Sequence, residues 1–199
     1  MIDLNNSGFR FVLASQSPRR QFLLRETGLE FDVMVKPTAE EFPSGLKAEE
    51  IAVYVSKEKA MQFDFSELPH NTLLITADTI VWLDNETIGK PGDAAEAKRM
   101  LTKLSGKKHM VATGICFRTI DRFHSFFVNT DVYFRDLEDH EINYYVDNYK
   151  PFDKAGAYGI QEWIGYIGVE RIDGSYFNVM GFPVQQIYTE LKKFIELHK

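Results

Sequence analysis

Apolar runs along this chain predict five strands. The run at 72–83 is almost continuously apolar and turns at Asp84-Asn85, whereas apolar residues alternate with polar ones in 125–135 and so share one face. A turn near Asp121 separates that segment from the strand before it. The predicted strands cover residues 11–14, 31–35, 72–83, 109–118 and 125–135.

Apolar residues at helical spacing predict helices between and after these strands. Ser17 is suited to cap the first helix, with Pro18 at its first position and Gly28 after its end. Asp93 and Glu96 have the spacing of a capping box. The predicted helices run from Pro18 toward Gly28, over 48–63, from Asp93 to Gly106, from Ile142 to Pro151, and from Val184 to the C-terminal region.

This alternation of strands and helices favours a mixed α/β domain. The sequence contains no internal repeat, no low-complexity tract and no stretch with the composition of a linker. We therefore expect residues 1–199 to form one compact unit, with two lobes as an option.

The overall composition restricts the partners of this protein. With 44% hydrophobic and 26% charged residues, the chain has a soluble globular composition, and no apolar run could span a bilayer. Its net charge of −6 argues against broad binding to nucleic acid polymers or membranes, but it allows a small anionic ligand. The single cysteine, Cys116, excludes an internal disulfide, so we expect a cytoplasmic protein.

Residues 15–20, Ser-Gln-Ser-Pro-Arg-Arg, form the first candidate site, at a strand-to-helix junction. Free amides and a partial positive charge at a helix N-terminus attract anions. Arg19 and Arg20 oppose that dipole unless a phosphate binds beside them. The alternative is that both are surface residues whose aliphatic stems cover apolar area.

Asp78 forms the second candidate site because it interrupts the apolar run 72–83. A carboxylate is costly to bury without a metal ion, a cation or amide donors. Asp78 therefore either caps a turn where the strand ends, or faces a cleft where it binds Mg²⁺ or activates water. Thr79 beside it either bonds a ligand or is an ordinary strand residue.

Three lysines and a glycine-rich segment complete the candidates. Lys59, Lys90 and Lys154 lie near predicted loops or helix ends, and with the arginines they could line one positive cleft for a polyphosphate. Gln161 ends the segment 155–161, in which small residues allow close approach of a ligand. The alternative for this segment is a glycine-bearing bend before a strand at Trp163.

Six motifs follow one another in an order that resembles the Maf family of nucleoside triphosphate pyrophosphatases, from about residue 11 to residue 191. The motifs are LASQSPRR at 13–20, ADT at 77–79, GKP at 89–91, LSG at 104–106, DKAGAYGIQ at 153–161 and DGSY at 173–176. The resemblance implies an ITPase-like α/β fold, with an elongated twisted sheet, flanking helices and a cleft between two lobes. It also allows a homodimer, because family members are often dimers.

The resemblance further implies an activity and roles for individual residues. The family hydrolyses a nucleoside triphosphate to the monophosphate and pyrophosphate with a divalent cation, Mg²⁺ or Mn²⁺. Asp78 falls on the position of the catalytic proton acceptor and would activate water for attack at the α-phosphorus. The other implied residues are Arg19, Thr79 and Gln161 for substrate choice, Lys59 and Lys90 in the active site, Glu40 with Asp78 as metal ligands, and Arg20 on the phosphates.

Three functions remain open within this resemblance. The Arg-Arg pair, ADT and AYGIQ resemble the branch that acts on dTTP and UTP. The branch acting on 7-methyl-GTP differs at the same places and is the second option. The third is a nucleotide-binding regulator of septum formation in cell division.

Overall fold

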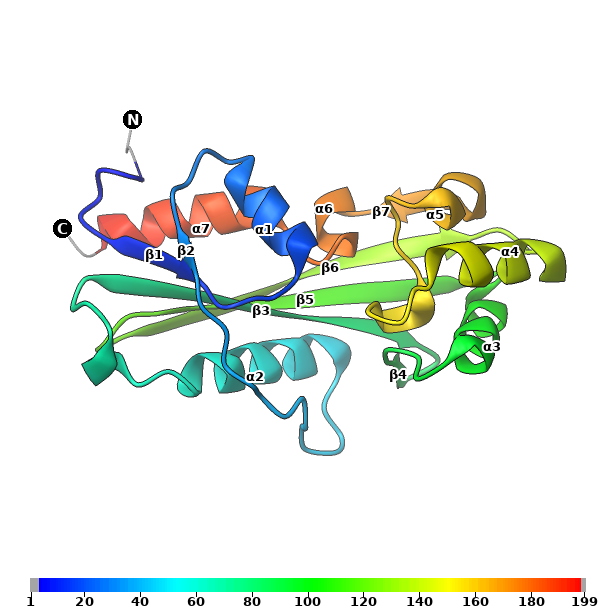
Figure 1. Ribbon diagram of the computed structural model, residues 1–199, viewed down its shortest axis with the longest axis horizontal. Coiled ribbons are helices and arrows are strands. Elements are labelled where there is room, and N and C mark those ends of the chain that lie inside the picture. The colour runs from blue at the N-terminus through cyan, green and yellow to red at the C-terminus, as the bar shows by residue number, and fades with distance from the viewer. Residues whose placement is uncertain (1–3, 198–199) are drawn as a thin grey trace.

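One mixed sheet forms the centre of the computed structural model, which describes residues 4–197 (Figure 1). Within these residues seven strands pair in the order β2-β1-β3-β5-β6-β7, with β4 paired to β3. β1 is parallel to both of its neighbours, and the remaining pairs are antiparallel. The strands are β1 (Arg10–Leu13), β2 (Asp32–Val33), β3 (Thr72–Leu83), β4 (Glu86–Ile88), β5 (Lys108–Arg118), β6 (Phe123–Phe134) and β7 (Val169–Asp173).

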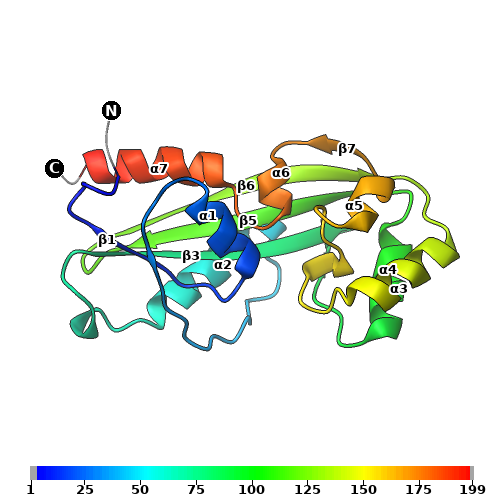
Figure 2. The same ribbon diagram turned by 45° about the horizontal axis from the view of Figure 1, so that its top comes forward.

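Helices flank both faces of this elongated sheet, and the long strands β3, β5 and β6 run between them (Figure 2). The α-helices are α1 (Pro18–Arg25), α2 (Ala48–Met61), α3 (Ala94–Leu104), α4 (Asp139–Tyr149), α5 (Trp163–Gly168), α6 (Tyr176–Val179) and α7 (Val184–Glu196). Two short 3₁₀ helices are η1 (Phe65–Glu67) and η2 (Ala155–Ala157). In the described part of the chain, no helix is long and apolar enough to cross a membrane.

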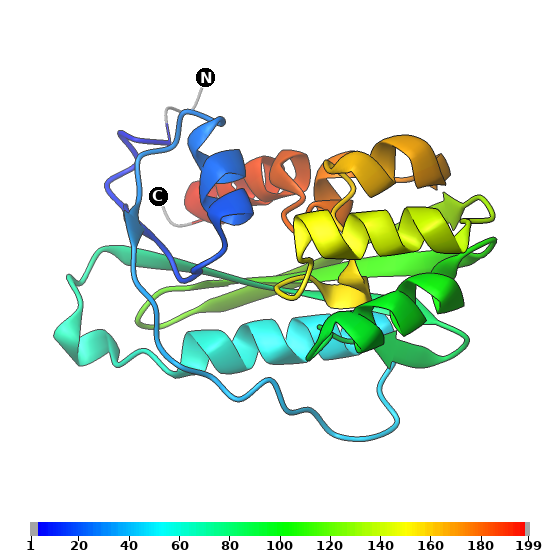
Figure 3. The ribbon, with the colours of Figure 1, turned by 45° about the vertical axis from the view of Figure 1, so that its right-hand side comes forward.

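The two faces of the sheet are covered differently (Figure 3). Helix α2 packs on β3, β5 and β6 from one side. On the other side, α1 and α7 build a hydrophobic core at one end of the sheet, and α3, α4 and α5 build a second core at the other end.

Strand β3 runs through both of these cores. Ala77 belongs to the first core and Val81 to the second, and Thr79 lies between them on the same face. The mixed α/β fold with an elongated sheet and flanking helices is therefore confirmed. The polar residue Thr79 separates the two hydrophobic cores, and a site can open at this position.

Most of the predicted elements agree with the structure. Strand β3 has the predicted bounds, and its turn to β4 uses Asp84 and Asn85, both with positive φ as a two-residue hairpin requires. Ser17 caps α1 by accepting a hydrogen bond from the Arg20 amide. Cys116 is buried, and burial raises the pKa of its thiol.

The strand expected at Trp163 is wrong, because residues 163–168 form helix α5. The Gly165 amide donates to the Glu162 carbonyl, and a Cβ on Gly165 would lie 1.9 Å from the Ile160 carbonyl oxygen. The chain thus folds back tightly on itself here, and this local contact overrides the strand preference of tryptophan and isoleucine.

Candidate active site

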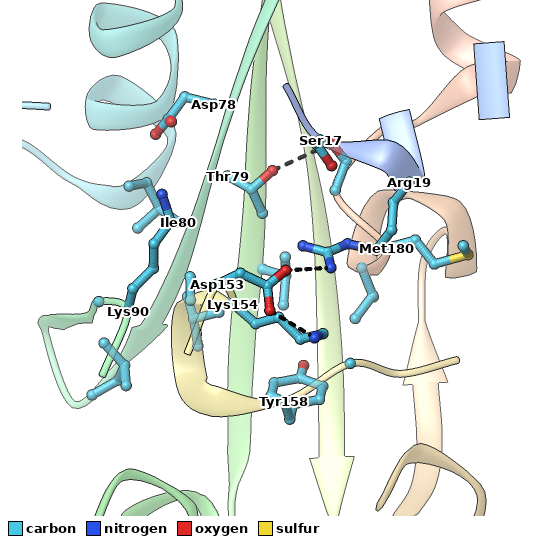
Figure 4. Close-up of a pocket in the computed structure, with 18 of the residues that line it drawn as sticks. Ser17, Arg19, Asp78, Thr79, Ile80, Lys90, Asp153, Lys154, Tyr158 and Met180 are labelled. Carbon is cyan, nitrogen blue, oxygen red and sulfur yellow. Dashed lines mark hydrogen bonds and ion pairs between the residues drawn. The ribbon is translucent and has the colours of Figure 1, made fainter. Parts of the chain in front are cut away.

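A gap in the edge of the sheet opens onto a cavity. β1 pairs with β3 only up to Ile75, and β4 pairs with it only from Val81, so within the described residues this edge of 76–80 has no strand partner. Successive side chains in a strand point to opposite faces, so the gap lies beside Asp78 on the α2 face and Thr79 on the other. A cavity of about 270 Å³ opens there (Figure 4).

Asp78 and Glu40 converge on one ammonium group. Lys59 Nζ lies 2.7 Å from Asp78 Oδ1 and 2.8 Å from Glu40 Oε1. Lys90 Nζ lies 3.3 Å from the other oxygen of Glu40. Asp78 is only 7% exposed, and the ion pair with Lys59 offsets the cost of burying its carboxylate. Asp78 therefore faces a cleft and does not cap a turn.

The two lysines also fix the charge of Glu40. Partial burial by itself would raise the pKa of this carboxyl, but the hydrogen bonds and charges of Lys59 and Lys90 outweigh it and lower the pKa below its usual value. Glu40 is therefore ionised at neutral pH and offers its oxygens to a cation.

Close packing of α2 on the sheet places Lys59 beside Asp78. Gly114 on β5 pairs with Asp78, and a Cβ at Gly114 would lie 2.2 Å from the backbone of Ala52 in α2. Thr76 donates a hydrogen bond of 2.6 Å to the carbonyl of Ser56 on the same helix. Lys59 follows Ser56 by about one helical turn, so these two contacts set its distance from Asp78.

Arg19 lies on the opposite wall of the cavity (Figure 4). Its Nη1 lies 2.9 Å from Asp153 Oδ2, and Lys154 Nζ lies 2.8 Å from the other oxygen of Asp153. Burial would raise the pKa of Asp153, but the hydrogen bonds from Lys154 and Arg19 lower it. Arg19 thus brings a positive charge to the cavity, and this charge is paired with the exposed carboxylate of Asp153.

Arg20 lines the same cavity, but its guanidinium bonds inside the protein. It donates to the carbonyls of Gly181 and Ala77, at 2.9 and 2.8 Å, and to the hydroxyl of Thr79 at 3.0 Å. Burial lowers its pKa, and the charge of Asp78 counters that effect. Its clearest role in this structure is to connect α1, β3 and the loop before α7, and to orient Thr79.

Gln161 lines the cavity, and its Oε1 is buried without a hydrogen-bond partner among the described residues. Tyr145 supports the loop before it by accepting a hydrogen bond from the Gly159 amide and donating one to Glu162. Nothing in the sequence singled out Tyr145, because its place in an apolar helical stripe indicated packing alone. The cavity also includes Tyr158, which likewise carried no signal of its own.

A second cavity, of about 620 Å³, adjoins the first. It is lined by Ser15, Gln16, Ser17 and Lys36, so the predicted anion-binding loop faces it. The two cavities share the residues Ser17, Arg20, Glu40, Lys59 and Lys90 in their linings. The Lys59–Glu40 contact therefore belongs to the lining of two adjoining cavities, one that includes Gln161 and one that includes the loop.

The carboxylates of Asp78 and Glu40 fit a divalent cation whose remaining coordination positions are filled by a bound ligand. Among the described residues, no group of three or more His, Cys, Asp or Glu side chains could hold a metal ion. Asp78 and Glu40 nevertheless place carboxylate oxygens against one cation, the ammonium of Lys59. Mg²⁺ is commonly held by one or two carboxylates together with substrate phosphates.

Comparisons with known proteins identify relatives that match nearly the whole chain. Three relatives are each named dTTP/UTP pyrophosphatase: one from Phocaeicola vulgatus is 54% identical over 95% of this chain and 98% of that protein. One from Flavobacterium psychrophilum is 50% identical over 92% of this chain and 93% of that protein. One from Porphyromonas gingivalis is 46% identical over 98% of this chain and 99% of that protein.

Among solved structures, a HAM1 protein from Coxiella burnetii matches with a TM-score of 0.42 and 18% identity, over 63% of this chain and 73% of that one. That likeness is too weak to bear on the fold. The family model described as Maf-like protein matches residues 10–194. Because this family model covers most of the chain and the relatives are 46–54% identical to it, this chain belongs to the Maf family.

Proposed function

We propose that this protein is a nucleoside triphosphate pyrophosphatase that hydrolyses dTTP and UTP to the monophosphate and pyrophosphate. The names of its relatives support the reaction and the substrates. The observation that carries the proposal is the position of Lys59 and Glu40 in the lining of both cavities, with Asp78 in the lining of the smaller one and bonded to Lys59.

The two cavities suit the two halves of the substrate. The nucleoside occupies the smaller cavity, where Gln161 has an unpaired amide oxygen to offer to the base. The terminal phosphates occupy the larger cavity, which is lined by Lys36 and by the loop that leads to the positive N-terminal end of α1 at Ser17. The α-phosphate then lies where the two cavities meet, near Lys59, which bonds Asp78 in the smaller cavity.

Asp78 takes a proton from a water molecule that attacks the α-phosphorus. A bond forms between the water oxygen and phosphorus, and the bond to the bridging oxygen breaks, so that pyrophosphate leaves with the electron pair. Lys59, Lys90 and Arg19 stabilise the negative charge that develops on the phosphates. Asp78 and Glu40 would hold Mg²⁺ or Mn²⁺, which when bound supplies further neutralisation of the phosphate oxygens.

The replacement Asp78→Asn tests the role of Asp78. General-base catalysis contributes about 10²–10⁴-fold, so kcat of the variant should fall by that factor. Its circular dichroism spectrum should match that of the wild type, and its unfolding should remain cooperative. Asp147→Asn, the same change at an exposed position on α4, is the matched control and should keep wild-type turnover. Wild-type turnover in a folded Asp78→Asn protein would overturn the mechanism.

Pyrophosphate release from dTTP, UTP, CTP, GTP and 7-methyl-GTP, with and without Mg²⁺ or Mn²⁺, tests the substrate. We expect dTTP and UTP to be turned over fastest, and only with metal. Preference for 7-methyl-GTP would place the chain in the other branch of its family. Binding of nucleotides without turnover of any of them would instead indicate a nucleotide-binding regulator.

A further inference from the structure

A buried histidine contacts a tyrosine of the cavity. His109 on β5 is 1% exposed, and its Nε2 lies 2.7 Å from the hydroxyl oxygen of Tyr158. Tyr158 lines the nucleoside cavity, and Figure 4 shows its hydroxyl oxygen on the side of Asp153 and Lys154. The Tyr158 ring packs edge-on against His109 and against Phe134, which fixes its orientation.

The surroundings of His109 determine where its proton lies. Burial lowers its pKa to about 4, so the ring is neutral at pH 7 and carries one N–H. Nδ1 is buried and has no hydrogen-bond partner among the described residues. Either tautomer leaves one proton without an acceptor in the protein: an Nδ1 proton of His109 would be enclosed in the core, whereas a hydroxyl proton of Tyr158 can meet an acceptor in the cavity, so the proton belongs on Nε2.

This tautomer sets the direction of the hydrogen bond. With its proton on Nε2, His109 donates to the oxygen of Tyr158, and the hydroxyl proton of Tyr158 is then free for an acceptor in the cavity. With the proton on Nδ1, Tyr158 would instead donate to His109 and have no proton to offer. The described residues provide Tyr158 with no other hydrogen-bond partner.

We propose that His109 is a positioning residue that makes Tyr158 a fixed hydrogen-bond donor to the 4-carbonyl of a uracil or thymine base. This inference rests on the proposed function, because it assumes a pyrimidine nucleotide in this cavity. Uracil and thymine have an acceptor oxygen at C4, where cytosine has an amino group that is itself a donor. A fixed donor therefore favours the first two bases and rejects the third.

The histidine tautomer can be read directly by ¹⁵N NMR on the wild-type protein at pH 7. We expect the His109 signals of an imidazole protonated at Nε2, and this measurement does not depend on catalysis. Signals of the Nδ1-protonated form would overturn the proposal.

Binding of UMP and CMP, which lack the scissile bond, tests the contact with the base. Tyr158→Phe and His109→Leu should each weaken UMP binding about tenfold, the value of one hydrogen bond of about 1.4 kcal/mol. Neither change should weaken CMP binding, because both remove the donor that opposes the cytosine amino group. His109→Gln keeps a side-chain N–H donor and should recover most of the UMP affinity. Equal losses for UMP and CMP, or no recovery with glutamine, would overturn the role of His109.

Kinetics separate this proposal from the proposed function. In wild-type protein that hydrolyses UTP, Tyr158→Phe should raise KM for UTP about tenfold with kcat unchanged, because the base does not react. A fall in kcat with KM unchanged would overturn the base contact. If wild-type protein hydrolyses no triphosphate, the proposed function fails, and the NMR and UMP measurements still decide the role of His109. If His109→Leu does not fold, Tyr158→Phe and the wild-type spectrum decide it.

Discussion

Gly114 is a point of very close contact between the sheet and α2, and an added methyl group there tests how Lys59 is positioned. The Cβ of Gly114→Ala would lie 2.2 Å from the Ala52 backbone, where ordinary contact begins at 3.4 Å, so α2 must move by about 1.2 Å. Overpacking of this kind costs about 1–3 kcal/mol, and Tm falls by about 2–4 °C per kcal/mol in a chain of this size.

The same movement should separate Lys59 from Asp78, because a shift of about 1.2 Å away from the sheet is enough to break their 2.7 Å hydrogen bond. A misplacement of about 1 Å can cost about 10²-fold in turnover. We therefore expect Gly114→Ala to lower kcat by about that factor at a temperature well below its Tm.

Thermal unfolding followed by circular dichroism, together with pyrophosphate release, measures both effects. Gly89→Ala is the control for stability, because no atom lies within 4 Å of its added Cβ and its φ is not left-handed. A Gly114→Ala protein with the Tm of that control and wild-type kcat would refute the argument that Gly114 sets the distance of α2.

Three further variants test contacts around the cavity. Arg20→Lys cannot reproduce all three hydrogen bonds of the guanidinium and should lower the free energy of unfolding by about 1.5–3 kcal/mol in urea denaturation; an unchanged midpoint and slope would contradict this. Tyr145→Phe leaves the Gly159 amide without its acceptor and should cost about 1–3 kcal/mol by the same measurement, whereas a neutral effect would mean that the hydroxyl supports nothing. Glu40 has a lowered pKa in the folded protein, so its stabilising contribution is present above its ordinary pKa of 4.5 and is lost as pH falls through the folded value. The stability difference between wild type and Glu40→Gln should therefore shrink below about pH 4.5, and a difference that is constant down to about pH 3 would contradict the ion pairs.

Local patterns predicted the elements better than they predicted the site. The apolar run of β3 has the predicted ends because its burial on both faces leaves a continuous signal. The position of Asp78 within it was left open between a turn and a cleft. Whether Asp78 lies in a turn or in a cleft depends on where β1 ends and β4 begins along the edge of β3. A local sequence pattern does not indicate where distant strands pair.

Arg20 and His109 show why part of the site could not be predicted. The sequence placed Arg20 beside Arg19 at one helix N-terminus and could not tell which of them bonds inside the protein. The structure does so, because Gly181 and Ala77 bring carbonyls to Arg20 from distant segments. His109 carried no signal at all, because a lone histidine in an apolar strand has no spacing that indicates a partner 49 residues away.

The gap along β3 also bears on self-association. A strand edge without a partner is a template on which another chain can add a strand and start aggregation. In this protein the carbonyl of Ala77 in the gap is already bonded to Arg20, and the charged Asp78 follows it. Strand addition at this opening is therefore disfavoured, and loss of Arg20 should make the protein more prone to aggregate as well as less stable.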